Sequence, residues 1–430
     1  MEILMLNCNT PLRASGIVAL DLFNGLRNKG HHVKMMVNKY DSNYPEDIIS
    51  METFWLAKRN DLIEKITRRL KIEKRRPTDI NYHFHEIKEK KSYYSIKRIL
   101  KYSGIKPDVV LVLFAKNFIN SKDMHDLFKL THAKIFWLMY DMAPLTGGCH
   151  YAWDCKGYQN NCGNCPGIYS KDPFDVSYEN LLYKKKYVDL TDIHLIAASE
   201  WQYRQAKVST LFKDKPIHKI LLSVNPEIFK PADKEALRLK LGIEPDRKVI
   251  FFGAIYLHIK RKGMSYLMES LKMLKERLDG TDLGNRVLLL VAGLEIKGLA
   301  ELLPFPSKYI GLLDHTYGIA SAFQVSDLFL CPSIEDSGPQ MINQSIMCGT
   351  PVVSFEMGVS PDLVITGQTG YMAKLEDSTD LAHGLYSVLS ANNDEYQKLS
   401  DNCRVLGLEL CSPEVQIKSI EKIIGNSVTG

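Results

Sequence analysis

Residues 328–353 read LFLCPSIEDSGPQMINQSIMCGTPVV, and this stretch decides the fold. It begins as an apolar strand at Leu328–Cys331 and continues as a loop that contains acidic residues and a glycine. A helical stretch around Gln344–Met347 then leads to a second apolar strand at Val352–Phe355. Strand, helix and strand in this order form the repeating unit of a parallel, doubly wound sheet, so we expect an α/β fold.

The same alternation extends over the chain in two blocks. The expected strands of the first block are Ile3–Asn7, His32–Val37, Val109–Phe114, Ile135–Met139 and Ile193–Ala197. Those of the second block are Val249–Phe252, Val287–Ala292, Tyr309–Leu312, Leu328–Cys331 and Val352–Phe355. The expected helices are Ile17–Asn28, Ser265–Arg277, Ile319–Val325 and a C-terminal helix that Ser412 caps, Pro413 begins and Gly425 ends.

Prolines at 216, 226 and 231 interrupt the pattern between the two blocks. We therefore expect two Rossmann-like domains, 1–220 and 221–411, with a C-terminal helix in 412–430 that packs back on the first. Two such domains that face each other across a cleft suit a nucleotide diphosphate, because strand carboxyl ends and helix N-termini line the cleft. Neither G-x-G-x-x-G in the first loop nor a P-loop motif occurs, which weakens the dehydrogenase and P-loop interpretations.

Composition excludes several other classes of protein. Of the 430 residues, 45% are hydrophobic and 24% are charged, which is typical of a globular chain. The longest apolar runs, Val109–Ala115 and Val287–Leu294, fall short of the roughly 18 residues that a membrane span needs. Met1 leads directly into an apolar strand, so we expect no signal peptide and a cytoplasmic location. A net charge of +5 is too small to indicate a nucleic-acid-binding protein.

Positive charge is concentrated between Lys58 and Lys106, where 16 basic residues face 6 acidic ones. One interpretation is a solvated helix-and-loop surface. The other is a patch that contacts an anionic membrane surface or an acidic acceptor, which would make the protein peripheral on the inner face of the membrane. Leu70 and Ile72 lie among the charges, as they would in an amphipathic segment.

Four of the nine cysteines, Cys149, Cys155, Cys162 and Cys165, lie close together with the spacing C-x5-C-x6-C-x2-C. Four thiolates at such short range can form a tetrahedral structural zinc site, for which His150 is a substitute ligand. Only the last pair has the tight spacing of a zinc ribbon, so free thiols and disulfides remain as alternatives. The other five read as small core residues: Cys8, Cys331, Cys348, Cys403 and Cys411.

The stretch 332–353 closely resembles the donor site of glycosyltransferase family 4, whose members are retaining enzymes of GT-B fold. The shared pattern is an acidic residue, a glycine-containing loop, a helix and Gly-x-Pro-Val-Val. The resemblance implies that Glu335, or its neighbour Asp336, holds hydroxyl groups of the donor sugar. It places Gln344 where the family has a glutamate that binds the ribose, and an amide can still form such hydrogen bonds without the charge. The donor-binding residues implied in this loop and helix are Asp336, Ser337, Gly338, Gln340, Met341 and Gln344.

Two further segments match the family's phosphate-binding positions. Lys260-Arg261-Lys262-Gly263 stands where the family keeps a basic residue and Lys-Gly for the donor diphosphate. A phosphate that loses a sugar gains negative charge, which the fixed cations Arg261 and Lys262 would stabilise. Ser15-Gly16 matches the glycine loop that approaches the phosphates. The alternatives are a solvated basic turn and an ordinary tight turn.

Residues 140–151, YDMAPLTGGCHY, are very similar to a stretch in family members with bacterial exopolysaccharide roles, where it runs into the same four cysteines. There the stretch begins His-Asp. Here Tyr140 replaces the histidine, while Asp141 remains and is, with Glu335, a catalytic candidate. The alternative is that Asp141 only caps a local turn.

The resemblance implies a hexosyltransferase that moves a hexosyl unit from a UDP- or GDP-linked sugar to a saccharide acceptor. The acceptor would be linked to a lipid carrier, in bacterial surface polysaccharide synthesis. Domain 1–220 would bind the acceptor and domain 221–411 the nucleotide sugar, with no cofactor for catalysis and with any zinc structural. The alternatives are a GT-B epimerase or phosphorylase and, in another class, a zinc-containing nucleic-acid-binding protein. Release of a nucleoside diphosphate separates these from the first interpretation, and salt-dependent RNA binding would favour the last.

Overall fold

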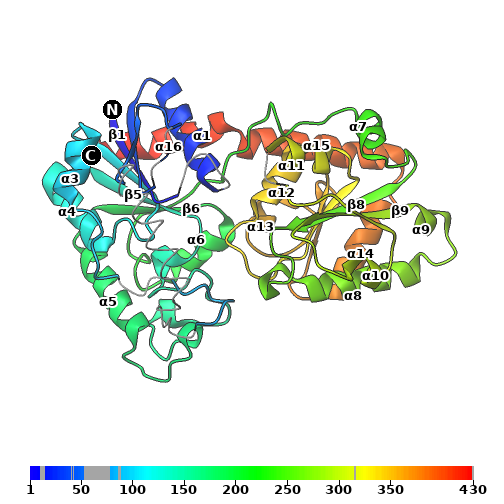
Figure 1. The fold of residues 1–430 in the computed structure, drawn as a ribbon, viewed down its shortest axis with the longest axis horizontal. Helices are drawn as coiled ribbons and strands as arrows, with labels where there is room; N and C mark the ends of the chain where they lie inside the picture. The colour runs from blue at the N-terminus through cyan, green and yellow to red at the C-terminus, as the bar shows by residue number, and fades with distance from the viewer. Residues whose placement is uncertain are drawn as a thin grey trace. The chain divides into compact units, whose positions relative to one another are not determined.

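The computed structural model describes residues 1–9, 15–39, 41, 43–52, 78–85, 89–313 and 316–428 (Figure 1). The chain divides into two compact units. Unit 1 comprises Met1–Ala198, Gln202–Ile220 and Ile417–Gly430, and unit 2 comprises Ser199–Trp201 and Leu221–Gln416. No helix in the described residues is long and apolar enough to cross a membrane.

Unit 1 contains a seven-stranded parallel sheet in the order β3-β2-β1-β4-β5-β6-β7. Its strands are β1 (Glu2–Asn7), β2 (His32–Val37), β3 (Ile48–Ser50), β4 (Val109–Phe114), β5 (Lys134–Met139), β6 (Ile193–Ala197) and β7 (Ile217–Lys219). Its helices are α1 (Ser15–Asn28), α3 (Ile96–Ser103), α4 (Ser121–Thr131), α5 (Val176–Asp189), α6 (Glu200–Lys207), which begins in unit 2, and α16 (Pro413–Val428).

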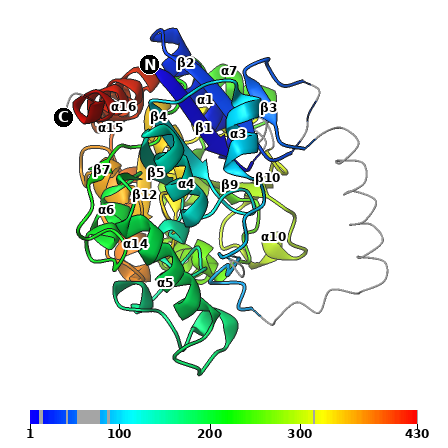
Figure 2. The ribbon, with the colours of Figure 1, turned by 90° about the vertical axis from the view of Figure 1, so that its left-hand side faces the viewer.

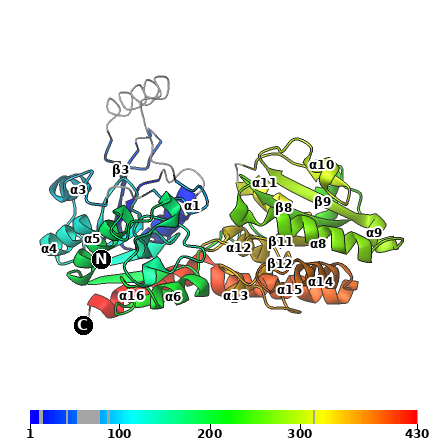
Figure 3. The ribbon, with the colours of Figure 1, turned by 90° about the horizontal axis from the view of Figure 1, so that it is seen from below.

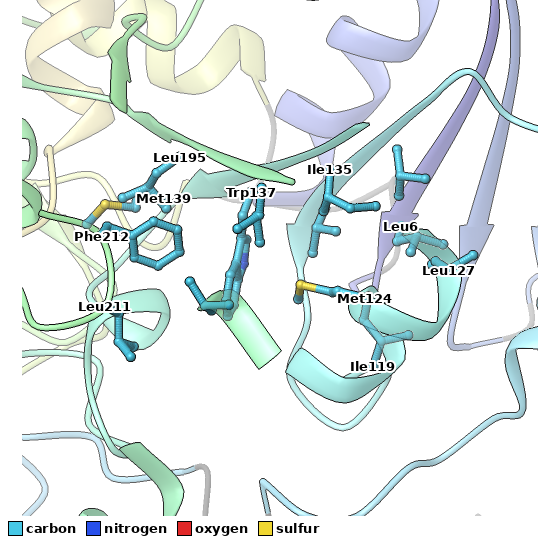
Figure 4. Close-up of a cluster of buried hydrophobic side chains, with 14 of the residues drawn as sticks. Leu6, Ile119, Met124, Leu127, Ile135, Trp137, Met139, Leu195, Leu211 and Phe212 are labelled. Atoms are coloured by element: carbon cyan, nitrogen blue, oxygen red, sulfur yellow. The ribbon is translucent and has the colours of Figure 1, made fainter. Parts of the chain in front are cut away.

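Both faces of this sheet are buried, as a parallel sheet requires. Alternate residues of β1 enter two separate clusters, Leu4 and Leu6 on one face and Ile3 and Met5 on the other. Helices α3, α4 and α5 cover the first face, and α1 and α16 cover the second (Figure 2). Figure 4 shows side chains of the first cluster, among them Leu6, Met124 and Trp137. The core of unit 1 therefore lies in two layers around a central sheet.

Unit 2 contains a six-stranded parallel sheet in the order β10-β9-β8-β11-β12-β13. Its strands are β8 (Lys248–Ala254), β9 (Val287–Gly293), β10 (Ser307–Tyr309), β11 (Leu328–Cys331), β12 (Val352–Phe355) and β13 (Gly370–Ala373). Its helices are α7 (Lys234–Leu241), α8 (Met264–Arg277), α9 (Asp282–Arg286), α10 (Leu299–Leu302), α11 (Thr316–Gln324), α12 (Gln340–Met347), α13 (Ser360–Leu363), α14 (Ser378–Leu389) and α15 (Asn393–Cys411).

The helices of unit 2 also form two layers, which lie above and below the strands in Figure 1, and Figure 3 shows the same helices from below. Helices α11, α12 and α15 pack with the face of the sheet that carries Phe251 and Phe329. Helices α8 and α14 pack against each other, and Tyr266 of α8 contacts Phe355 edge-on on the opposite face. Both units therefore have the expected α/β architecture of a Rossmann-like domain.

In each sheet the strand order reverses at one place, and ligands of such sheets bind there, beyond the carboxyl ends of the strands. In unit 1 the reversal lies between β1 and β4, and in unit 2 it lies between β8 and β11. The loops that follow β4, β8 and β11 therefore mark where each unit can hold a ligand.

Several boundaries differ from the expected ones, among them the following three. Helix α16 does not end at Gly425 but continues to Val428. Its last turns are held by the burial of Ile420 and Ile424. Strand β10 ends at Tyr309, although the apolar residues run on to Leu312. Helix α12 begins at Gln340, four residues before the stretch in which a helix was expected.

Candidate functional site

The site in unit 2 is built from the turn that follows β8 and the loop that follows β11. The basic turn is a 3₁₀ helix at Lys260–Lys262, and Gly263 ends it with φ of +67°. A Cβ atom at Gly263 would lie 1.7 Å from the carbonyl oxygen of Pro332. The backbone amide of Ile334 donates to the carbonyl of Arg261 at 2.9 Å. Only a glycine can therefore bring the basic turn this close to the acidic loop.

The two expected diphosphate-binding cations meet one carboxylate. Arg261 Nη1 and Lys262 Nζ each lie 2.6 Å from Asp336 Oδ2. Burial alone would raise the pKa of Asp336, but the charges of Lys262 and Arg261 hold that pKa below its usual value. Asp336 is therefore ionised and balances the two cations.

The other residues of this loop that were expected to bind the donor lie next to Asp336 in the chain. Glu335 and Ser337 are buried on either side of Asp336, and Ser337 Oγ forms no hydrogen bond within the described residues. No side chain caps the N-terminus of α12, which begins directly after Pro339. An uncapped helix N-terminus next to fixed cations favours an anionic ligand.

Helix α12 carries the other expected contacts. Gln340, Met341 and Gln344 are partly exposed, whereas Ile342, Ile346 and Met347 are buried against the core of unit 2. Positions i and i+4 share one side of a helix, so Gln340 and Gln344 lie on the same side. The expected donor-binding residues of unit 2 thus lie on adjoining elements, namely the 3₁₀ turn, the loop and α12.

Asp141 lines a cavity of unit 1 that has both polar and apolar walls. Its Oδ2 atom is 2.6 Å from His150 Nδ1, and its Oδ1 atom accepts the backbone N–H of Ala143 at 2.8 Å. Burial raises the pKa of Asp141, but His150 and the Ala143 amide outweigh burial and lower it. Asp141 therefore both caps the local turn, as the structural alternative expected, and forms a hydrogen bond with the imidazole of His150.

The cavity has a volume of about 360 Å³ and is lined by side chains from β4, β5 and the loops after them. Lys184 of α5, only 1% exposed, donates to the carbonyls of Ala143 at 2.8 Å and Thr146 at 3.0 Å. Its Nζ atom is 3.8 Å from Glu89, which in turn accepts from Ser121. This buried cation fixes the turn that holds Asp141.

Tyr140 does not replace the missing histidine as a polar group. Its ring stacks on Phe114, with ring centroids 4.3 Å apart and an interplanar angle of 14°. Its hydroxyl is buried without a hydrogen bond to any described residue, and burial raises its pKa. The imidazole that contacts Asp141 comes from His150, nine residues further along the chain.

The other expected site residues are placed as follows. Ser15 is the first residue of α1 and Gly16 is buried beside it, while residues 10–14 of the preceding loop lie outside the described residues. The basic residues 68–76 and Lys88 also lie outside them. Cys149, Cys155, Cys162 and Cys165 are all free thiols and line one small cavity of unit 1.

Sequence reasoning missed the roles of Lys184 and of the Asp141–His150 pair. A signal for Lys184 was present, because it follows Leu181 by three positions and precedes Val188 by four, which places it on the apolar side of α5. His150 was considered only as a zinc ligand. Its contact with Asp141 depends on how the intervening turn closes, and no spacing rule predicts that.

Comparison with known proteins identifies the part of the chain that carries the unit 2 site. Residues 246–391 match the model of the family described as glycosyl transferases group 1. D-inositol 3-phosphate glycosyltransferase of Stackebrandtia nassauensis is 27% identical over 179 residues, which cover 38% of this chain and 38% of that protein. The chain thus spans about two fifths of the length of the curated relatives it matches.

Solved structures share the fold over the whole chain. Sucrose-phosphate synthase from Thermosynechococcus elongatus has a TM-score of 0.68 at 16% identity, with 100% of this chain and 99% of that chain covered. HepE from Anabaena, in complex with UDP and glucose, has a TM-score of 0.62 at 14% identity, with 99% and 100% covered. The expected GT-B fold is confirmed, with two Rossmann-like sheets of seven and six strands.

Proposed function

We propose that this chain, whose residues 246–391 match the model of the glycosyl transferases group 1, is a retaining hexosyltransferase that uses a nucleotide diphospho-sugar. The observation that carries the proposal is the pair of cations, Arg261 and Lys262, held by Asp336 at the carboxyl ends of β8 and β11. A site with two fixed positive charges and an uncapped helix N-terminus suits a diphosphate. The matched family and the fold shared with a UDP complex support the same class of donor.

In the proposed step, a hydroxyl oxygen of the acceptor forms a bond to the anomeric carbon on the face from which the diphosphate leaves. The bond between that carbon and the β-phosphate oxygen breaks, and the leaving phosphate takes the proton of the acceptor hydroxyl. Arg261 and Lys262 stabilise the negative charge that builds up on the phosphate. Glu335, at the buried start of the loop, holds donor hydroxyls, so catalysis consists of positioning and charge stabilisation without a protein nucleophile or a catalytic cofactor.

Unit 1 is proposed to bind the acceptor in the cavity that Asp141, His150 and Glu89 line. A saccharide presents many hydroxyl groups, and charged and imidazole groups are good partners for them. We further propose a lipid-linked saccharide acceptor in bacterial surface polysaccharide synthesis, since the stretch 140–165 is similar to that of family members with exopolysaccharide roles.

Thermal unfolding in the presence of nucleotides tests the proposal without knowledge of the acceptor. A ligand that binds the folded protein stabilises it by about 2.7 kcal/mol at one hundred times its dissociation constant. We expect UDP or GDP, or a sugar conjugate of either, to raise the unfolding temperature, and uridine or guanosine without phosphate to have little effect. If no nucleoside diphosphate or conjugate shifts the transition, the donor assignment is wrong.

Gln344→Glu is expected to preserve nucleotide binding and to tighten it by roughly fivefold, because a hydrogen bond to a charged acceptor contributes about 1 kcal/mol more than a neutral one. Calorimetric titration with the nucleoside diphosphate that stabilises the wild-type protein measures this change. Gln344→Ala is the matched control and should bind more weakly than either. A loss of binding in a folded Gln344→Glu protein would show that Gln344 does not hold the ribose.

We also propose that the basic stretch 58–106 makes the protein peripheral on an anionic membrane surface. Its excess of positive charge should bind vesicles that contain anionic lipid, with affinity that falls as salt screens the charges. Sedimentation with anionic and neutral vesicles measures this binding. The double change Arg75→Glu and Arg76→Glu should weaken binding to the anionic vesicles and leave binding to the neutral ones unchanged. Equal affinity for both kinds of vesicle would mean that the stretch is only a solvated surface.

A further inference from the structure

The four-cysteine segment of unit 1 is folded without regular secondary structure. Between residues 149 and 169 its only helical turns are two 3₁₀ turns, Gly157–Gln159 and Pro166–Ile168. Four of its non-glycine residues adopt positive φ: Trp153 (+51°), Cys162 (+54°), Asn164 (+47°) and Tyr169 (+52°). Such conformations cost roughly 1 kcal/mol or more each and persist only where the surroundings impose them.

Apolar packing supplies little of that constraint. The buried cluster of this segment consists of Phe84 and two of the cysteines themselves, Cys149 and Cys165, with a few partly buried neighbours. No disulfide crosses the segment, because all four cysteines are free. A strained loop with so small a core needs another tie.

The four cysteines contribute to the wall of the same cavity. They line a single cavity of about 20 Å³, which is space for about one water-sized particle. A Cβ atom at Gly157 would lie 3.4 Å from Cys155 Sγ and 3.6 Å from Cys162 Sγ, so a larger residue there would occupy space beside both sulfurs. The fold thus brings four cysteines that are separated along the chain to one cavity.

A backbone amide donates to one of the four sulfurs. The N–H of Gly157 donates to Cys155 Sγ at 3.5 Å. Amide donors to sulfur are the groups that support thiolate ligands around a metal ion.

We propose that Cys149, Cys155, Cys162 and Cys165 bind one Zn²⁺ ion, which ties this segment together beside the Asp141–His150 pair. Four thiolates in tetrahedral arrangement are a usual closed structural site for zinc. When the ion binds, four S–H bonds break, four Zn–S bonds form and four protons pass to solvent. This role is structural and goes beyond the proposed transfer reaction.

Binding requires a local adjustment. In the part of the chain that the structure describes, no three His, Cys, Asp or Glu side chains are already arranged to hold a metal ion. The sulfurs must therefore turn about their Cα–Cβ bonds toward the shared cavity. Four thiolates repel one another when no cation is present, and a bound divalent ion removes that repulsion.

Elemental analysis of the full chain, purified without added metal or chelator, tests the proposal. We expect about one zinc per chain, loss of at least nine tenths of it in Cys162→Ser, and full retention in the control Cys403→Ser, whose thiol is buried in unit 2. A thiol reagent should modify four additional cysteines only after a chelator removes the zinc. Nucleoside diphosphate binding is measured in parallel. It tests the proposed donor site in unit 2, so a failure of the zinc proposal can be told apart from a failure of the proposed function.

Two results would overturn the site. One is a zinc content near zero in wild-type protein, together with four thiols that react equally before and after zinc is added. The other is zinc that stays bound in Cys162→Ser and Cys155→Ser. If a serine variant fails to fold, the wild-type zinc content and the effect of the chelator on thiol reactivity still decide the question.

Discussion

Lys262→Ala is expected to lower the rate of glycosyl transfer by about 10²–10³-fold, the range seen when one group that stabilises a developing oxyanion is removed. The reason is the position of the ammonium group, which shares Asp336 with Arg261 at the place proposed for the leaving diphosphate. Initial rates of nucleoside diphosphate release from the donor measure the effect. Binding of the free nucleoside diphosphate should weaken as well, because its phosphates carry negative charge in the ground state.

Folding should survive this change, since Arg261 still neutralises Asp336. Lys272→Ala is a matched control, because Lys272 lies exposed on the adjacent helix α8 and contributes a similar positive charge. Its rate should equal that of the wild-type protein. A folded Lys262→Ala protein with normal turnover would remove the basis for placing the diphosphate at the basic turn.

The sequence predicted the two sheets well for a physical reason. Parallel strands are buried on both faces, so Val109–Phe114 and Val287–Gly293 appear as continuous apolar runs between polar loops. The order of strand, acidic loop, helix and strand over 328–355 was also predictable, because it is a local feature, although α12 begins four residues before the expected helix. Helix α15 was not predicted, since it buries only Leu399, Cys403, Gly407 and Cys411 over 19 residues and offers no strong apolar stripe.

Contacts between residues that are far apart in the sequence could not be predicted from it. Lys262 and Asp336 are separated by 74 residues, and the sequence marked both as donor-binding groups without indicating that they neutralise each other. The same holds for Lys184, whose partners Ala143 and Thr146 lie 41 and 38 residues away. Each pairing depends on how strands and helices are ordered in space, which a pattern along the chain does not contain.

Asp327→Ala is expected to destabilise unit 2 by about 3–5 kcal/mol, the usual cost of leaving a buried ionic partner uncompensated. Asp327 Oδ2 accepts from Arg238 Nη2 at 2.7 Å and from the backbone N–H of Val249 at 2.6 Å, while Oδ1 is 3.1 Å from Lys234 Nζ. Arg238 is only 4% exposed, so its charge cannot be hydrated once the carboxylate is removed. Urea unfolding followed by circular dichroism measures the loss.

Glu244→Ala is the control, because Glu244 forms an ion pair with Arg247 at 2.6 Å but its side chain is 66% exposed. An exposed pair of this kind contributes about 0–1 kcal/mol, so this variant should unfold close to the wild-type midpoint. Equal stability of both variants would show that the Asp327 network does not hold α7 to the sheet.

The same carboxylate predicts how stability depends on pH. Burial raises the pKa of Asp327, but Lys234, Arg238 and the Val249 amide outweigh burial and lower it in the folded state. The unfolded chain, with an aspartate pKa of about 3.9, therefore takes up a proton before the folded one does. The contribution of Asp327 is fully present above that value and is lost as the pH falls through the lower pKa of the folded state. Asp327→Asn should accordingly lose less stability than the wild-type protein between about pH 5 and pH 2, and an unchanged acid dependence would mean that the ion pair does not govern that loss.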